Sequence, residues 1–513
     1  MRKSSMNNRM RSAGFFTLLL LAPVLGCTDL TEVPESAISP ENFYTNEAEV
    51  IGGLASVYAQ LRSTTDDYYN VSEVTSDEII VPTRGTDWYD NGQWLDLDRQ
   101  TFEPNSPATL SLINGAWNSL FAGVAKANVV LSAIENSNFP SKEVVQAELR
   151  TLRAFYYYLL QDLFGGVPIV TDVAIEARPR NTRAEVFNFI ESELNATRTV
   201  LPATWPAAMN GRLTRGAADA ILASLYLNAE VFTGTVTAAG LQRGGARWQD
   251  AVDAADRVIN SGVYSLASNW RSNFTADNHL SPEIIMAVKF IPAGGLGLNF
   301  LMRALHYNQF TPSPWNGFAT IAETYNAFDP NDQRRQIFLE GRQFNLETGA
   351  PVNDRAGNPL IFDPAIPDPT QAGEGAGVRI AKWPVDPNHV AQENGNDYAH
   401  FRLAEVMLVK AEALNELGRT GEALVLLNAV RARNFASPQP VTVTAQADVR
   451  TAIMNERLFE LTAESKRRTD LIRYGRWTST WFNKTVTEPY KVLMPIPQTQ
   501  IGTNPQLEQN PGY

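Results

Sequence analysis

The chain has 513 residues, a net charge of −12 and a single cysteine. The acidic balance argues against nucleic acid, other polyanions and anionic membrane surfaces as partners, because these bind to positively charged surfaces. A single cysteine cannot form an internal disulfide, so the stability of the fold must come from the burial of apolar side chains.

Residues 1–26 have the layout of a secretory signal peptide. A basic start without acidic residues is followed by the apolar run 15–25 and by the small residue Gly26. The run is too short for a transmembrane helix, which needs about 20 apolar residues. Removal of this segment leaves 39 basic against 55 acidic residues, a net charge of −16.

The only cysteine, Cys27, stands where the signal peptide would be cleaved. The sequence Val24-Leu25-Gly26-Cys27 resembles the lipobox of bacterial lipoproteins, although Val24 replaces the usual leucine and Leu25 is bulkier than the usual residue. We expect Cys27 to carry several acyl chains, because one chain alone anchors a protein only marginally. Residues 27–46 are then a polar tether. The alternative is an ordinary secreted protein with an incidental cysteine.

Apolar residues at helical spacing predict a mainly α-helical protein. A capping box of Thr182 and Glu185 opens one helix. The pairs 216–232 with 248–262 and 401–418 with 422–433 have the spacing of tetratricopeptide-like hairpins, with a generic helical bundle as the alternative. The other expected helices cover 46–62, 112–134, 141–168 and 455–477.

Two regions of the mature chain differ in texture. Residues 47–262 are expected to form an N-terminal helical region, and 263–513 a C-terminal region. The latter divides into a loop-rich part with short strands (263–400), a helical part (401–476) and an extended tail (477–513), in which the prolines forbid a helix. Residues 64–109 also look like loops, and such long aperiodic stretches usually carry function or decorate a core.

Three acidic residues, Glu456, Glu460 and Glu464, stand four apart and would share one helix face. Carboxylates one turn apart lie about 5–6 Å from each other, close to the spacing in a retaining glycosidase, so a helical glycoside hydrolase is one alternative. We favour a structural ion-pair network with the nearby arginines, because no pocket residue is evident around the acids.

Two loop segments combine aromatic and polar residues in the way that sugar binding requires, with rings for stacking and polar groups for hydroxyls. The segments are 84–94 and 305–318. The alternative for each tryptophan is that it fixes its loop to the body, as we expect for the helical Trp117 and Trp248. The predicted ligand-contacting residues are Trp88, Tyr89, Asn91, Trp94, Tyr307 and Trp315.

Metal or cofactor chemistry is not expected. The four histidines show no metal-ligand spacing, and no second cysteine is present for a zinc site. No glycine-rich phosphate loop follows a predicted strand, and no Gly-x-Ser-x-Gly motif occurs. We therefore predict no cofactor, no metal and no catalytic residue.

Four blocks together resemble the SusD/RagB family of nutrient-uptake lipoproteins: 147–170, 401–418, 455–477 and 495–513. The resemblance covers nearly the whole mature chain. It implies a tetratricopeptide-like core and a surface lipoprotein that binds glycans or other nutrients as the lid of a SusC-type TonB-dependent transporter. Because the family's ligand contacts lie on variable loops, no binding residue is carried over. A scaffold that binds only protein is the remaining alternative.

Overall fold

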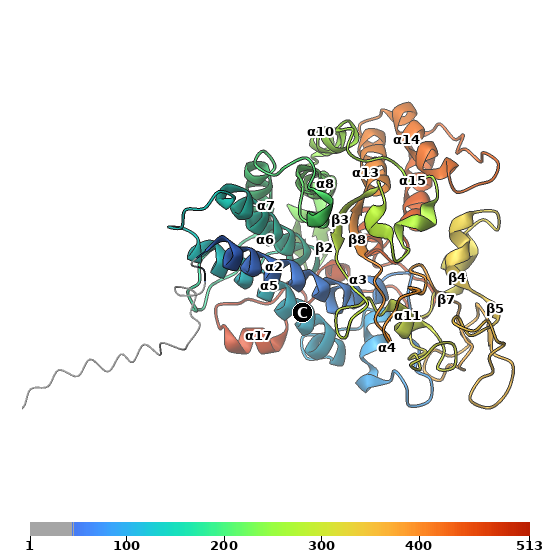
Figure 1. Ribbon diagram of the computed structural model, residues 1–513. Helices are drawn as coiled ribbons and strands as arrows, with labels where there is room; N and C mark the ends of the chain where they lie inside the picture. The colour runs from blue at the N-terminus through green and yellow to red at the C-terminus, as the bar shows by residue number, and fades with distance from the viewer. Residues whose placement is uncertain (1–43, 45) are drawn as a thin grey trace, which may run out of the picture.

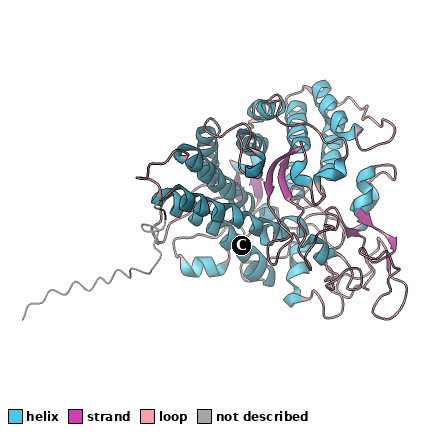
Figure 2. Cartoon of the chain, viewed as in Figure 1, coloured by secondary structure: helices cyan, strands magenta, loops and turns pink. Residues whose placement is uncertain are grey.

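The structure is a computed structural model that describes residue 44 and residues 46–513. Cys27, the signal peptide and nearly all of the tether lie outside the described residues. The predicted mainly α class is confirmed, and in Figures 1 and 2 the long helices lie at the left and top, with most loops at the lower right. The helices are α2 (Glu47–Gln60), α3 (Asp67–Val74), α4 (Gln93–Asp98), α5 (Asn114–Ala133), α6 (Lys142–Phe164), α7 (Arg183–Thr197), α8 (Arg215–Leu227), α9 (Ala229–Phe232), α10 (Trp248–Ile259), α11 (Phe300–Ala304), α12 (Ala322–Ala327), α13 (Leu403–Glu416), α14 (Thr420–Ala432), α15 (Gln446–Leu461), α16 (Arg467–Arg473) and α17 (Gln498–Thr503).

The strands of the described part are short and form only two-stranded antiparallel sheets. The central pair, β3 with β8, joins the start of the C-terminal region to the strand that leads directly into α13. The pairs are β1 (Thr235–Thr237) with β2 (Gly240–Gln242), β3 (Ile284–Val288) with β8 (Tyr398–Arg402), β4 (Phe338–Leu339) with β7 (Arg379–Ile380), and β5 (Gly341–Arg342) with β6 (Ile361–Phe362).

The predicted helical hairpins are present, and small residues let their helices approach closely. α5 packs on α6, α8 on α10, and α13 on α14. A Cβ atom on Gly123 of α5 would lie 2.5 Å from the ring of Tyr156 on α6, so this contact requires a glycine. The alanines of α8 and α10 are fully buried at their own contact. The capping box of Thr182 and Glu185 also forms as predicted.

The predicted helix 455–477 is broken into α15 and α16. α15 ends at Leu461, so the expectation that Glu464 shares a helix face with the other two glutamates is wrong. The N–H of Ala463 donates to Glu78 at 2.7 Å, and the N–H of Ser465 donates to Glu73. These carboxylates take the backbone donors that a continuing helix would have used, and they hold a turn between the two helices.

Two further expectations need correction. The 64–109 segment contains α3 and α4. The sequence hides α3 because residues Tyr68 to Val74 are buried on every side, which removes the amphipathic period. The tail contains α17, which lies between Pro497 and Pro505. Pro497 is the N-cap of that helix, where proline removes no helical hydrogen bond.

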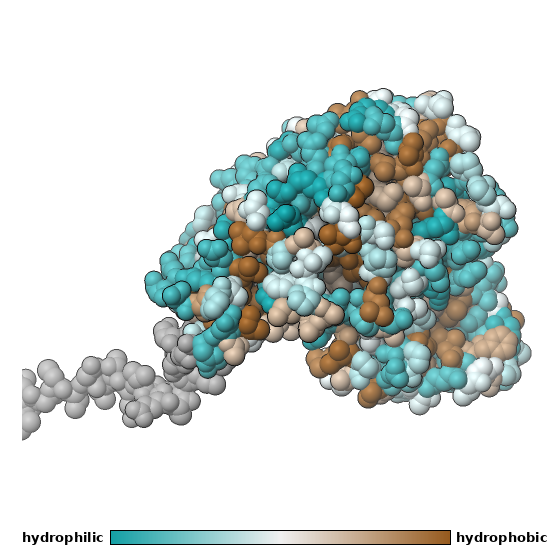
Figure 3. Space-filling view, turned by 45° about the horizontal axis from the view of Figure 1, so that its top comes forward, coloured by the Kyte–Doolittle hydropathy of each residue, from teal (hydrophilic) through white to brown (hydrophobic). Residues whose placement is uncertain are grey.

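One large hydrophobic core extends from Val50 in α2 to Leu507 in the tail and joins the N-terminal and C-terminal regions. On the face shown in Figure 3, hydrophobic residues reach the surface in separate patches among hydrophilic ones. In the described range, the search for a helix long and apolar enough to cross a membrane finds none.

Candidate functional site

The two predicted aromatic segments come together in space, although they lie far apart in the sequence. The indole N–H of Trp88 donates to the carbonyl oxygen of Trp315 at 2.6 Å. The ring of Trp88 also packs edge-on against Phe318, with 5.6 Å between the centroids. The segments 84–94 and 305–318 therefore form one surface, beside α4 and α11 (Figure 1).

Five of the six predicted contact residues reach this surface. Tyr89 exposes 58% of its area. The others are either exposed or half-buried, so their rings and amide groups are accessible from outside. We call these five residues the platform: Trp88, Tyr89, Asn91, Tyr307 and Trp315.

The prediction for the sixth residue, Trp94, is wrong. Trp94 lies in α4, is only 6% exposed and donates its indole N–H to Asp90 at 2.7 Å. Its ring packs against Trp88 and Phe318, at 5.3 and 5.5 Å between centroids. Trp94 therefore supports the platform from within, as in the alternative that the sequence left open.

The backbone of the platform loops is held in an unusual conformation. Trp88, Asp90 and Asn91 have φ angles of 61°, 38° and 57°, and Asn316 has 50°. Such angles are rare for residues other than glycine and cost about 1–3 kcal/mol each. They therefore persist only where the surrounding structure enforces them. The platform is therefore a preformed surface.

Two buried arginines hold the loops from below. Arg84 donates to the carbonyl oxygens of Asn316 at 2.8 Å and Ala376 at 2.9 Å. Arg379 donates to the side-chain oxygen of Asn316 at 2.9 Å. Burial lowers the pKa of Arg84 to about 10 and also lowers that of Arg379. Both side chains work as multiple donors that connect separate loops.

Sequence reasoning missed a polar network on the same surface, because its members come from a segment without periodicity. Arg355 donates from Nε to Glu374 at 2.5 Å, and Glu374 also accepts from the buried His306 at 2.8 Å. Burial alone would raise the pKa of Glu374, but the hydrogen bonds from Arg355 and His306 outweigh it and lower the value to about 2. Glu374 is therefore a permanent anion.

Tyr307 is the platform residue closest to this network. Its hydroxyl donates to Asp87, which belongs to the other platform loop. Burial and then the neighbouring Asp87 raise the pKa of Tyr307 to about 12, so the hydroxyl keeps its proton at neutral pH. The Tyr307 ring and its hydrogen bond thus link the two segments on the outer side, as Trp88 links them on the inner side.

Comparison with known proteins assigns the fold. The profile of the SusD family matches residues 263–487, and a second profile, described as starch-binding associating with outer membrane, matches residues 38–227. Two matches in this order account for most of the chain. The chain belongs to the SusD/RagB family.

Relatives of this SusD-family chain match it over most of their length. The SusD-like protein P25 of Formosa agariphila is 26% identical and covers 97% of this chain and 98% of itself. The starch-binding protein SusD of Bacteroides thetaiotaomicron is 26% identical, with 87% and 85% covered. The solved structure of a laminarin-binding SusD-like protein superposes with a TM-score of 0.72 at 24% identity, covering 92% of this chain and 100% of that one.

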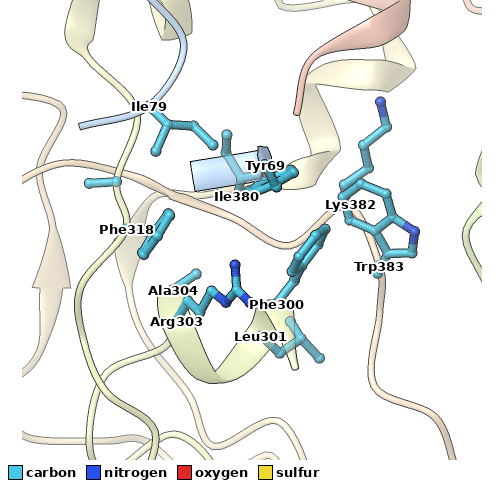
Figure 4. Close-up of a pocket in the computed structure, with 11 residues that line it drawn as sticks. Tyr69, Ile79, Phe300, Leu301, Arg303, Ala304, Phe318, Ile380, Lys382 and Trp383 are labelled. Carbon is cyan, nitrogen blue, oxygen red and sulfur yellow. The ribbon is translucent and has the colours of Figure 1, made fainter. Parts of the chain in front are cut away.

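An apolar cavity of this SusD-family chain lies beside Phe318 (Figure 4), whose ring packs against Trp88 of the platform. Phe318, Phe300 and Tyr69 form its walls together with the aliphatic part of α11. The space inside is about 30 Å³, whereas one water needs roughly 10–15 Å³ of such space. A sugar ring does not fit, so the cavity belongs to the packing of the platform and is not itself a glycan site.

The acidic pair of α15 is buried in an ion-pair network, as predicted. Glu456 and Glu460 are 1% and 0% exposed. Both accept from Arg334, at 2.6 and 3.0 Å. Carboxylates held in this way offer no accessible oxygen to a glycosidic bond, so this pair is not a catalytic dyad of the SusD-family chain.

Proposed function

We propose that this SusD-family protein is a lipid-anchored, surface-exposed glycan-binding protein that delivers its ligand to a SusC-type TonB-dependent transporter. The single observation that carries glycan binding is the preformed platform of exposed rings and polar groups. Two relatives, a starch-binding SusD and a laminarin-binding SusD-like protein, support the same class of ligand.

The chemistry of the platform suits a sugar chain. The rings of Tyr89 and Trp88 offer apolar surface for the C–H faces of sugars, and Asn91 offers an amide donor and acceptor for hydroxyl groups. The platform needs no rearrangement before binding, which lowers the entropic cost of association.

The anchoring and the transporter rest on other grounds. Cys27 follows a signal peptide and a lipobox-like sequence. The matching profile is described as associating with the outer membrane. The transporter partner follows from family membership. In this proposal the protein performs no chemistry, because binding and release are sufficient for its role.

The test is calorimetric titration of the purified protein with maltoheptaose, laminarihexaose and a wider panel of neutral oligosaccharides. We expect binding of at least one of them, and Tyr89→Ala should weaken it by about tenfold, as for the loss of an aromatic anchor. The matched control is Val425→Ala on α14, which truncates another well-exposed apolar side chain away from the platform.

Three results would contradict the proposal. Absence of binding to every oligosaccharide of the panel would favour the scaffold that binds only protein. Unchanged affinity of Tyr89→Ala would place the glycan site elsewhere on the molecule. Release of shortened oligosaccharides during the titration would instead favour a glycoside hydrolase.

A further inference from the structure

Arg355 lies at the edge of the platform, although it comes from the loop-rich segment between β5 and β6. Its guanidinium group stacks on the ring of Tyr307, with 4.1 Å between Cζ and the ring centroid. The side chain nevertheless exposes 52% of its area. An arginine that is both stacked and half exposed presents a fixed edge of N–H groups to solvent.

Three contacts fix the orientation of Arg355. Nε donates to Glu374 at 2.5 Å, and the backbone N–H donates to the other oxygen of the same carboxylate at 3.0 Å. Nη2 lies 3.3 Å from Oδ2 of Asp87, which also accepts from the Tyr307 hydroxyl. Within the described residues, no hydrogen bond engages Nη1. The outer edge of the guanidinium group is therefore fixed in orientation, and its N–H groups can still donate to a ligand.

The charged groups bonded to the platform loops give no positive excess. His306 adds no charge at neutral pH, because burial lowers its pKa. An anionic sugar would gain no net attraction here and would meet the carboxylate of Asp87, which accepts from the Tyr307 hydroxyl and lies 3.3 Å from Arg355. The charged groups are the guanidinium groups of Arg84, Arg355 and Arg379 and the carboxylates of Asp87, Asp90, Glu347 and Glu374.

We propose that Arg355 is a ligand-contacting residue that donates from Nη1 and Nη2 to two adjacent hydroxyl oxygens of a neutral sugar, next to the unit that stacks on Tyr89. The inference rests on the proposed function and deepens it, because it names the donor and restricts the ligand to uncharged glycans. A planar guanidinium group suits a pair of acceptors, whereas a lysine offers a single point charge.

The test compares wild type, Arg355→Gln and Arg355→Lys by calorimetry with neutral oligosaccharides and with oligogalacturonate as the charged probe. We expect the wild type to prefer a neutral oligosaccharide. Both variants should lose about tenfold or more in affinity for it, because neither side chain offers two parallel donors. The unfolding midpoint should stay unchanged, since the side chain is half exposed.

The matched control is Arg335→Gln. Arg335 also stacks on a tyrosine, Tyr325, at the same distance of 4.1 Å, but neither residue belongs to the platform. This variant should bind as the wild type does. An equal loss of affinity in Arg355→Gln and Arg335→Gln would mean that removal of any arginine–tyrosine stack weakens binding through the fold. That result would overturn the inference.

The remaining outcomes separate the inference from the proposed function. Wild-type binding together with full affinity of Arg355→Gln overturns the role of Arg355 and leaves glycan binding intact. Tighter wild-type binding of oligogalacturonate overturns the restriction to neutral sugars. No binding of any oligosaccharide by the wild type overturns the proposed function, and this inference with it.

Discussion

Glu460 of α15 is the residue on which three arginines of the C-terminal region converge. Its carboxylate is fully buried and contacts Arg334, Arg402 and Arg433 at 3.0, 2.9 and 2.6 Å. Burial alone would raise its pKa, but the three guanidinium groups outweigh burial and lower the pKa to about 2. The carboxylate is therefore stabilised by its partners, and its partners depend on it.

The substitution Glu460→Gln is expected to lower the free energy of unfolding by about 3–5 kcal/mol, because it leaves buried arginines without their shared counter-charge. Urea denaturation measures this loss. The control Glu422→Gln breaks an exposed pair with Arg419 and should change stability by less than about 1 kcal/mol. Equal stability of the two variants would contradict a structural role for Glu460.

The same substitution should change the response to acid. The pKa of Glu460 is about 2 in the folded protein, below the ordinary 4.5, so its contribution to stability is complete above pH 4.5 and is lost as the pH falls toward 2. Denaturation at pH 7 and at pH 3 should therefore show a smaller difference between Glu460→Gln and the wild type at the lower pH.

Individual site residues were predictable only where local chemistry decides. Tyr89 and Asn91 follow from an aromatic and a polar residue in an aperiodic loop. The burial of Trp94 did not follow from the sequence, because α4 begins only after the left-handed Gly92 and is too short to show a helical period. The position of Arg355 beside the platform did not follow either, because its contact with Asp87 joins distant parts of the chain.

At the scale of elements, the end of α6 shows how the tail is fixed. α6 ends at Phe164, whose carbonyl oxygen accepts from Arg180 at 3.2 Å and from Asn510 at 3.1 Å. Asn510 also donates to the carbonyl oxygen of Met494 at 2.7 Å. One amide group of the tail therefore closes a helix terminus and holds the preceding chain against it.

The substitution Asn510→Ala should lower the free energy of unfolding by about 1–3 kcal/mol, because it leaves buried carbonyl oxygens with fewer donors. Urea denaturation is the measurement. The exposed Gln506, whose side-chain amide donates to the carbonyl oxygen of Ala177, provides the control, and Gln506→Ala should stay within about 0.5 kcal/mol of the wild type. A tail that contributes nothing to stability would leave both variants alike.

Among the elements, the amphipathic helices were predictable because one face is buried and the period is visible. α3 and α17 were not, for opposite reasons. α3 is buried all round, and α17 has no fully buried residue and occupies only the interval between two prolines. The break before Glu464 was hidden as well, because it depends on carboxylates from residues 73 and 78.

At the scale of the whole molecule, the proposed lipid anchor on Cys27 would decide where the platform works. We expect mature wild-type protein to carry acyl chains on Cys27 and to sediment with outer membranes. Cys27→Ser should be recovered without lipid and should no longer sediment with outer membranes, because it lacks the thiol that would carry the acyl chains. Fractionation and mass spectrometry of the N-terminal peptide test this.

The control for the anchor is Val24→Leu, which installs the usual lipobox residue and should leave acylation intact. An unacylated wild-type product cleaved at another bond would contradict the anchor. Glycan binding by the purified protein would remain testable in that case, since the platform does not include Cys27.

The hydrogen bonds from Arg84 and Arg379 to the loops determine which substitutions this surface can accept during evolution. These arginines hold mainly carbonyl groups of the backbone, which every amino acid provides. Replacing the side chain of residue 374 or 376 removes none of these bonds, whereas a Cβ atom on Gly375 would lie 2.1 Å from the carbonyl oxygen of Ile361. The backbone arrangement therefore accepts different side chains at these two positions. During evolution the ligand preference of the surface can change while the loops keep the same conformation.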